Sequence, residues 1–131
     1  MKNILAYLLT AALMVSTPLL AEEAELKAPE GYAFSGAVVK HVRVRNIKRT
    51  EVVDDHTILF FMTGKKIYAN IMKNRCAGLK RENRFGYEVR VGQLSDLDVI
   101  TVLDAFGVRN HCGLGKFHEV SKTEDDQPIA K

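Results

Sequence analysis

Two cysteines constrain the fold of this chain more than any other feature of its sequence. Cys76 lies in the stretch 74–79 and Cys112 in the stretch 112–117, with short β-rich runs before and between them. A bond between the two thiols would close a long loop, and on the chain-entropy account it would destabilise the unfolded state by about 4 kcal/mol. Since a small domain has only about 5–15 kcal/mol of net stability, such a bond would decide whether the domain stays folded.

The N-terminal segment predicts export. Lys2 precedes an almost uninterrupted apolar run at residues 4–15, and a Ser-Thr-Pro sequence follows. This pattern is typical of a cleaved signal peptide, here residues 1–21, although Leu19 fits the cleavage motif poorly. A permanent membrane anchor is the alternative, but the apolar run is shorter than the roughly 20 residues that a spanning helix needs. We therefore expect a periplasmic or secreted protein with no stable membrane span after cleavage, in which the two cysteines form a disulfide.

The remaining chain divides by composition. Residues 22–36 are polar and predict a linker, residues 37–121 predict a single β domain, and residues 122–131 predict a disordered tail. Residues 31–121 contain 15 basic and 9 acidic residues, whereas both flanks are acidic. A basic body is compatible with an anionic partner, and a solvated surface of mixed charge is the alternative.

Short runs with β-type patterns fill the predicted domain. Residues 57–62 are almost continuously apolar, which predicts a strand covered on both faces, and residues 66–72 predict its hairpin partner across a turn at residues 63–65. Residues 85–91 alternate between apolar and polar side chains and predict an amphipathic strand. Residues 38–45 alternate valine with basic residues, which predicts a half-buried strand with a basic outer face.

Residues 95–106 allow two interpretations. Ser95 and Asp98 fit a helical capping box, and apolar residues recur at helical spacing after them. The β-branched run at residues 99–102 favours a buried strand, and we prefer this interpretation. The glycines on either side of Leu114 predict a close approach of two backbone segments.

These patterns together predict the fold class. We expect a mainly β protein, built as a small antiparallel barrel or a curled sheet of five to seven short strands, with at most one or two short helices.

A basic surface is the first candidate site. It consists of five residues in and just after the alternating segment: Lys40, Arg43, Arg45, Lys48 and Arg49. We interpret it as a candidate face for an anionic component of the cell envelope, with another envelope protein as the alternative partner. Because no aromatic residues interleave with these cations, we do not predict nucleic-acid binding.

Asp54, Asp55 and His56 are the candidate acid/base groups of a small enzyme. Adjacent residues on a strand point to opposite faces, so we favour the alternative that the aspartates form a turn and bond nearby amides. The positions of His56, His111 and His118 relative to the cysteines match no zinc pattern, and we predict neither a metal nor a cofactor.

Four motifs carry a resemblance to a known family: residues 50–60 (TEVVDDHTILF), 74–79 (NRCAGL), 98–102 (DVITV) and 112–117 (CGLGKF). In this order they resemble small exported proteins of Gram-negative bacteria that are catalogued as a domain of unknown function. The resemblance implies a signal-bearing single domain without established activity, so it transfers no catalytic residue. Members often carry two further cysteines near the positions of His41 and Ser95, and their joint absence here implies that Cys76–Cys112 is the remaining disulfide.

The function that we expect is non-enzymatic. The chain would be an exported β domain that acts as a binding or envelope-accessory module. A small, hydrolytic enzyme that uses Asp54, Asp55 or His56 is the alternative.

Overall fold

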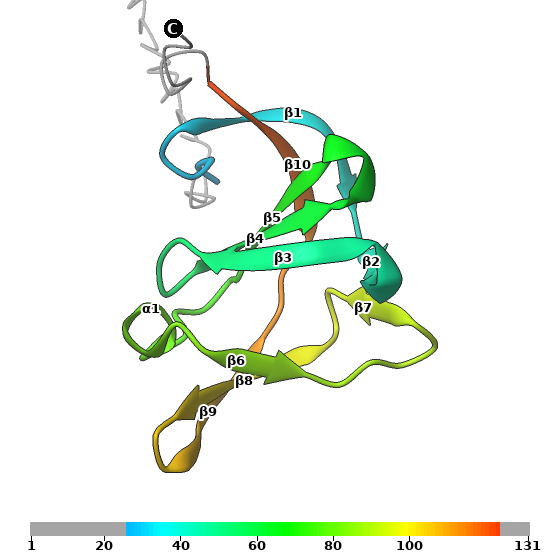
Figure 1. Cartoon of the computed structure of the whole chain (residues 1–131). Coiled ribbons are helices and arrows are strands. Elements are labelled where there is room, and N and C mark those ends of the chain that lie inside the picture. The colour runs from blue at the N-terminus through cyan, green and yellow to red at the C-terminus, as the bar shows by residue number, and fades with distance from the viewer. Residues whose placement is uncertain (1–25, 124–131) are drawn as a thin grey trace, which may run out of the picture.

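The computed structural model describes residues 26–123. The predicted signal peptide and the predicted tail from residue 124 onward lie outside the described residues. The described residues form ten short strands in antiparallel sheets, one short α-helix and no closed barrel. The predicted mainly β, antiparallel class is therefore confirmed in its open form (Figure 1).

A five-stranded antiparallel sheet forms the upper part of the molecule in Figure 1. Its strands, in spatial order, are β1 (Tyr32–Val39), β10 (Phe117–Lys122), β5 (Ile67–Ile71), β4 (Thr57–Met62) and β3 (Ile47–Val52). The predicted hairpin is confirmed, since β4 pairs with β5 across the turn η2 (Thr63–Lys65).

Two smaller sheets lie below the first in Figure 1. One has the order β6 (Phe85–Tyr87), β8 (Val99–Asp104) and β9 (Gly107–Gly113), and the other pairs β2 (His41–Arg43) with β7 (Gln93–Ser95). The turn η1 (Val44–Asn46) follows β2, and the single-turn helix α1 (Leu79–Glu82) precedes β6.

The main core lies between the large sheet and the smaller sheets. Ile58 and Phe60 of β4 pack in one cluster with Ile100 of β8, and Phe60 meets Phe117 edge-on with ring centroids 5.4 Å apart. On the opposite face of the large sheet, Leu59 belongs to a second, smaller buried cluster. The strand at residues 57–62 is therefore covered on both faces, as its continuous apolar run predicts.

The predicted disulfide is present. Cys76 and Cys112 are bonded, with their Cα atoms 5.7 Å apart. Cys112 lies on β9, and the Cys76 N–H donates to the carbonyl oxygen of Asp55 at 2.7 Å, in the turn between β3 and β4. The bond thus links the three-stranded sheet to the end of the large sheet.

A buried asparagine holds the chain where it enters the last strand. Asn70 of β5 is fully buried, and its side chain donates to the Gly115 carbonyl at 2.6 Å and accepts the Gly115 N–H at 2.9 Å. A Cβ atom at Gly115 would overlap the carbonyl oxygen of Ile71. The predicted close backbone approach is confirmed at Gly115, and at Gly113 a Cβ atom would meet nothing within 4 Å.

The interpretation of residues 95–106 as a strand is also confirmed. Asp98 accepts the Ser95 N–H at 2.6 Å, and Ser95 accepts the Leu97 N–H at 3.2 Å, so the side-chain bonds resemble those of a helix cap. They close a turn instead, because β8 follows and buries Ile100 and Val102 completely.

Both predicted boundaries of the domain differ from the structure. β1 begins at Tyr32, inside the predicted linker 22–36, and it pairs with Lys122, which had been assigned to the tail. β1 is a largely exposed edge strand, so its sequence carries no apolar alternation, and only its pairing with β10 reveals it.

Two predicted strands are shorter than expected, and the ten strands exceed the predicted five to seven. The segment 38–45 is divided among β1, β2 and η1, because the chain leaves the large sheet to pair with β7. The segment 85–91 is a strand only as far as Tyr87, where pairing with β8 ends, and Val91 beyond it is 98% exposed.

Candidate anion-binding surface

Three shallow hollows adjoin one another along one side of the domain. The first contains Arg43, Arg45 and the exposed Val91. The second shares Arg43 and Gln93 with the first. The third shares Lys66 with the second, so the three hollows form a continuous strip.

Six exposed cations line this strip, and we call them the basic end: Arg43, Arg45, Lys48, Arg49, Lys65 and Lys66. Among the described residues, no aspartate or glutamate lines any of the three hollows. The segments that carry the basic end lie along the right-hand edge of Figure 1, at η1, η2 and the start of β3.

The basic end accounts for the charge excess of the domain. Residues 31–121 contain 15 basic and 9 acidic residues, and six of the basic residues belong to the basic end. The remaining nine basic residues equal the acidic residues in number. Positive charge is therefore concentrated on one side of the fold, where it produces a local field that attracts anions.

Local structure positions these cations. β3 is an edge strand, and its pairing with β4 shifts register between Ile47 and Arg49. The Arg49 guanidinium lies 3.6 Å from the ring centroid of Phe61, and its ion pair with Glu51 has an N–O distance of 3.4 Å. In η2 the positive φ of Lys65, 66°, turns the chain back toward β5. The aromatic contact holds Arg49 in place without removing its charge.

The structure gathers four of the five basic residues that the sequence indicated. Lys40 is exposed in the connection from β1 to β2, and it lines none of the three hollows. Sequence reasoning missed Lys65 and Lys66, which lie across the β3–β4–β5 pairing from Lys48. The predicted hairpin turn at residues 63–65 was a usable signal, since such a turn brings its basic residues to one end of the sheet.

The candidate acid/base residues form a turn and do not converge. Asp54 accepts the N–H of His56 at 2.7 Å. Asp55 accepts the Lys80 N–H at 2.9 Å and pairs with Arg75, whose Nη2 is 2.9 Å from its carboxylate. Both aspartates are thus committed to local structure, as the turn interpretation predicts.

The Asp55 carboxylate is stabilised in its charged form. The hydrogen bond from the Lys80 N–H lowers its pKa below the ordinary value of 3.8, and the hydrogen bond and charge of Arg75 lower it further, against a small opposing effect of burial. A general acid or base near neutral pH needs the opposite shift. Asp55 is consequently a structural anion at neutral pH.

His56 lies in a different hollow, of about 550 Å³, on which His118 and Lys116 also lie. The His56 ring nitrogen Nδ1 is 3.3 Å from the carbonyl oxygen of Met72. Burial, and then the charge of Lys116, lower the pKa of His118 below its ordinary value of 6.5. No aspartate or glutamate among the described residues lines this hollow, so the predicted pairing of His56 with an acid does not occur.

One further hollow does contain both an acid and a histidine. Asp98 and His111 lie on it, together with Thr101. The Asp98 carboxylate accepts the Ser95 N–H, and His111 Nδ1 lies 3.2 Å from Thr101 Oγ1. Thr101 and His111 are direct cross-strand neighbours in β8 and β9, so this contact is an ordinary feature of sheet pairing.

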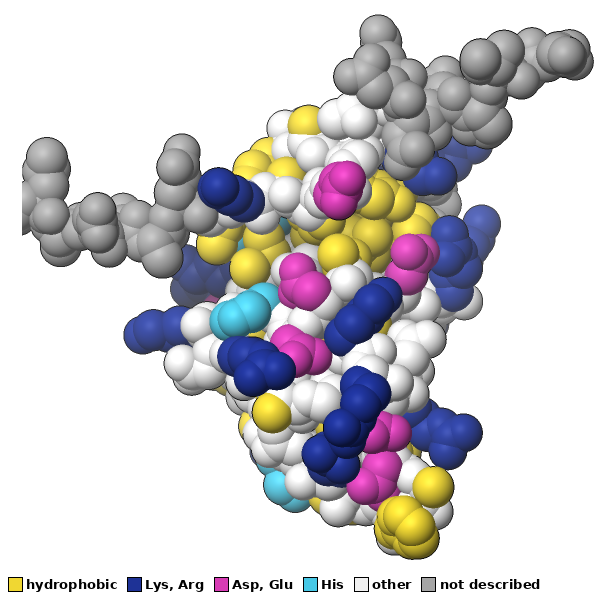
Figure 2. Space-filling model, turned by 90° about the vertical axis from the view of Figure 1, so that its left-hand side faces the viewer, with side chains coloured by type: hydrophobic (Ala, Val, Ile, Leu, Met, Phe, Trp, Pro, Cys, Tyr) yellow, Lys and Arg dark blue, Asp and Glu magenta, His cyan; other side chains and the backbone are white. Residues whose placement is uncertain are grey.

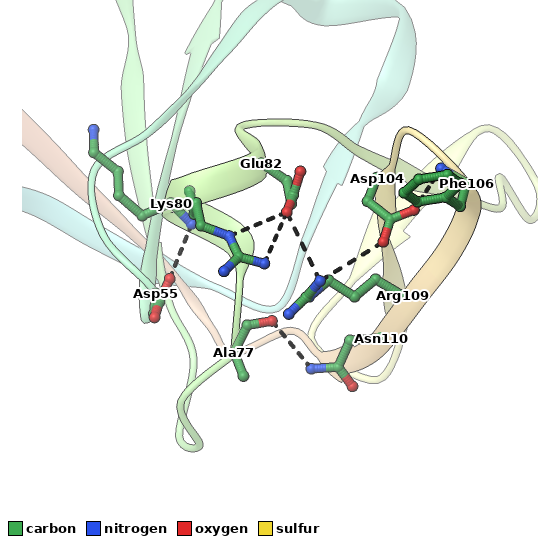
Figure 3. A network of polar contacts seen from close by, with 9 residues as sticks. Asp55, Ala77, Lys80, Glu82, Asp104, Phe106, Arg109 and Asn110 are labelled. Atoms are coloured by element: carbon green, nitrogen blue, oxygen red, sulfur yellow. Dashed lines mark hydrogen bonds and ion pairs between the residues drawn. The ribbon is translucent and has the colours of Figure 1, made fainter.

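The first cysteine motif is used throughout for structure (Figure 3). The Ala77 carbonyl accepts from the Asn110 side chain at 3.4 Å, and Gly78, with a φ of 86°, leaves the space occupied by the Arg109 side chain. Arg109 in turn lies 3.9 Å from Glu82 of α1 and 3.7 Å from Asp104 of β8. These contacts fasten the β8–β9 hairpin beside the disulfide.

The opposite side of the molecule differs from the basic end. Figure 2 shows that charged side chains of both signs are interspersed over much of this side, and that hydrophobic side chains gather in its upper part. Anion attraction is therefore a property of one side.

Within residues 26–123, no three His, Cys, Asp or Glu side chains are grouped so that they could hold a metal ion. No helix in the same range is long and apolar enough to cross a membrane. Comparison with protein-family models, curated proteins and solved structures found no match to this chain.

Proposed function

We propose that this protein is an exported, non-enzymatic binding module that holds an anionic component of the cell envelope at its basic end. The observation that carries the proposal is the continuous strip of six exposed cations, which no acidic residue lines among the described residues. The periplasmic or secreted location is part of the proposal, and a disulfide is compatible with it. The resemblance to small exported proteins of Gram-negative bacteria points the same way.

The chemistry favours binding over catalysis. The acid/base residues of the hydrolytic alternative are occupied, since Asp54 and Asp55 accept backbone N–H groups and Asp55 also pairs with Arg75. The cations of the basic end, by contrast, are exposed to solvent. Arginine and lysine in this state bind phosphate, sulfate or carboxylate groups through charge-assisted hydrogen bonds.

Binding to two polyanions tests the proposal. The probes are dextran sulfate and vesicles that contain phosphatidylglycerol, titrated at 50 and 300 mM salt. The double variant Arg43→Gln/Lys66→Gln removes two charges from the strip. At about 1 kcal/mol per charge near an anionic surface, we expect its affinity to fall about thirtyfold at the lower salt concentration.

The matched control is Arg81→Gln/Arg84→Gln, which removes the same charge beside α1 and outside the strip. We expect this variant to bind nearly as well as the unmodified protein, and binding by both proteins to weaken steeply with salt. Equal losses in the two double variants would show that binding depends only on total charge. Absence of binding to both probes would refute the proposed function.

A further inference from the structure

The turn that joins β6 to β7 carries an exposed valine at its tip. Arg90 and Gln93 pair across this turn, and the Gln93 N–H donates to the Arg90 carbonyl at 3.1 Å. The two residues between them, Val91 and Gly92, have φ values of 54° and 70°. This is the two-residue hairpin turn that favours asparagine followed by glycine, because both positions require a positive φ.

Valine is an unfavourable residue at this position. A β-branched side chain with a positive φ is strained. Val91 is also 98% exposed, so no packing contact compensates for the strain. A strained residue that contributes nothing to the fold is a candidate for a role outside the fold.

The turn presents its apolar side toward the basic end. Val89 and Val91 line the same hollow as Arg43 and Arg45, whereas Arg90 lines the neighbouring hollow. The period-two alternation of residues 85–91 is thus retained beyond β6, but its apolar side faces solvent beside cations instead of facing the core.

We infer that this valine-tipped turn inserts into the interface of an anionic phospholipid bilayer while the surrounding arginines contact its head groups. This inference rests on the proposed function and names the anionic component. An exposed apolar tip beside Arg43 and Arg45 matches an interface that is apolar below and anionic above. The long arginine stems allow the guanidinium groups to remain among the head groups while the valine goes deeper. A polysaccharide or a soluble anion offers no apolar layer for Val91.

Fluorescence of a single tryptophan tests the insertion directly, because the chain contains no tryptophan. Val91→Trp places the probe at the tip, and Phe106→Trp places it at the tip of the β8–β9 hairpin, where Phe106 is 99% exposed. With phosphatidylglycerol vesicles we expect a blue shift, and quenching by brominated lipid, only for Val91→Trp. A solvent-like spectrum for bound Val91→Trp, or equal shifts for both variants, would overturn the inference.

The variant Val91→Asn separates insertion from a structural role. Asparagine tolerates a positive φ, so we expect the midpoint of thermal unfolding to stay constant or to rise by about 4 °C. Affinity for phosphatidylglycerol vesicles should fall about tenfold, as expected for the loss of a partly buried valine. Affinity for dextran sulfate should not change, and Phe106→Asn should leave both affinities unchanged.

The outcomes separate this inference from the proposed function. If the protein binds dextran sulfate but not the vesicles, or if Val91→Asn binds vesicles as well as the unmodified protein does, the insertion is wrong and anion binding stands. An equal loss of both affinities in Val91→Asn would also overturn insertion, since it would place Val91 in polyanion binding generally. If neither probe binds, both proposals fail.

Discussion

Asn70 shows how a single buried polar side chain fixes the path of the backbone. Its two hydrogen bonds with Gly115 satisfy both main-chain groups of that residue, close to the Ile71 carbonyl. No buried side-chain nitrogen or oxygen among the described residues lacks a hydrogen-bond partner. Asn70 therefore stabilises the connection that brings Cys112 and β10 together.

Replacing Asn70 with alanine leaves two buried backbone groups without partners. At about 1–3 kcal/mol for each unsatisfied group, we expect Asn70→Ala to lower the free energy of unfolding by about 2–4 kcal/mol in urea titrations. Asn110→Ala is the matched control, because the Asn110 side chain makes one long, exposed hydrogen bond to Ala77. A loss of similar size in both variants would contradict this role of Asn70.

Asp55 makes the stability of the protein depend on pH. Its pKa in the folded protein is below its ordinary value of 3.8, so its ionised form stabilises the fold above that pH, and this contribution disappears as the pH falls through the folded pKa. We expect Asp55→Asn to be less stable than the unmodified protein at pH 7, by about 1 kcal/mol or less for this exposed site. The difference should shrink toward pH 2.

Urea unfolding of both proteins at pH 7, 4 and 2 measures this difference. Asp54→Asn is the control, since asparagine can still accept the His56 N–H. If the difference between Asp55→Asn and the unmodified protein were constant across this range, the Asp55 carboxylate would not be the titrating group.

At the scale of elements, β2 and β7 show how pairing decides what the sequence leaves open. His41 lies directly opposite Ser95 in their antiparallel register, with Val42 opposite Leu94. These are the two positions at which the resemblance places a further cysteine pair. Opposed residues in an antiparallel pair have Cα atoms about 4.5–5.5 Å apart, which lies within the range of a disulfide.

We expect the double variant His41→Cys/Ser95→Cys to form a second disulfide on oxidation. Intact mass after thiol alkylation should then show four protected cysteines, and the thermal midpoint should rise. The control His41→Cys/Asp96→Cys shifts one cysteine by a residue, to the other face of the strand, and should keep two free thiols. Free thiols in both variants would show that the register is different in solution.

The segment after β6 shows the same effect at its other extreme. Its alternation predicts a strand through residue 91, but β8 offers no pairing partner beyond Tyr87. Without a neighbouring strand the valines have no core to face, and they emerge beside Arg43. Alternation in a sequence thus indicates two faces, and only pairing decides whether the apolar face is buried.

At the scale of the whole molecule, one covalent bond joins two sheets that otherwise meet only through packing. The bond between Cys76 and Cys112 spans 36 residues of sequence, and Cys76 is fully buried. Near it, α1 meets the β8–β9 hairpin through the ion pairs of Arg109.

Removing the disulfide should destabilise the whole domain. We expect Cys76→Ala/Cys112→Ala to lose about 4 kcal/mol of unfolding free energy, measured by urea titration. Dithiothreitol should lower the stability of the unmodified protein by a comparable amount and leave the double variant unaffected. Reactive thiols in the oxidised protein, found by alkylation and intact mass, would contradict the bond.

The sequence by itself determined the class of fold, the hairpin at residues 57–72, the disulfide and most of the cations of the candidate site. These features depend on local patterns of side chains or on the small number of cysteines, so they can be read without knowing which segments meet. Tertiary structure alone decided the edge strand at Tyr32, the addition of Lys65 and Lys66 to the basic end, and the exposure of Val91 beside Arg43. These features depend on pairing between distant segments, and pairing determines which face of each strand is covered.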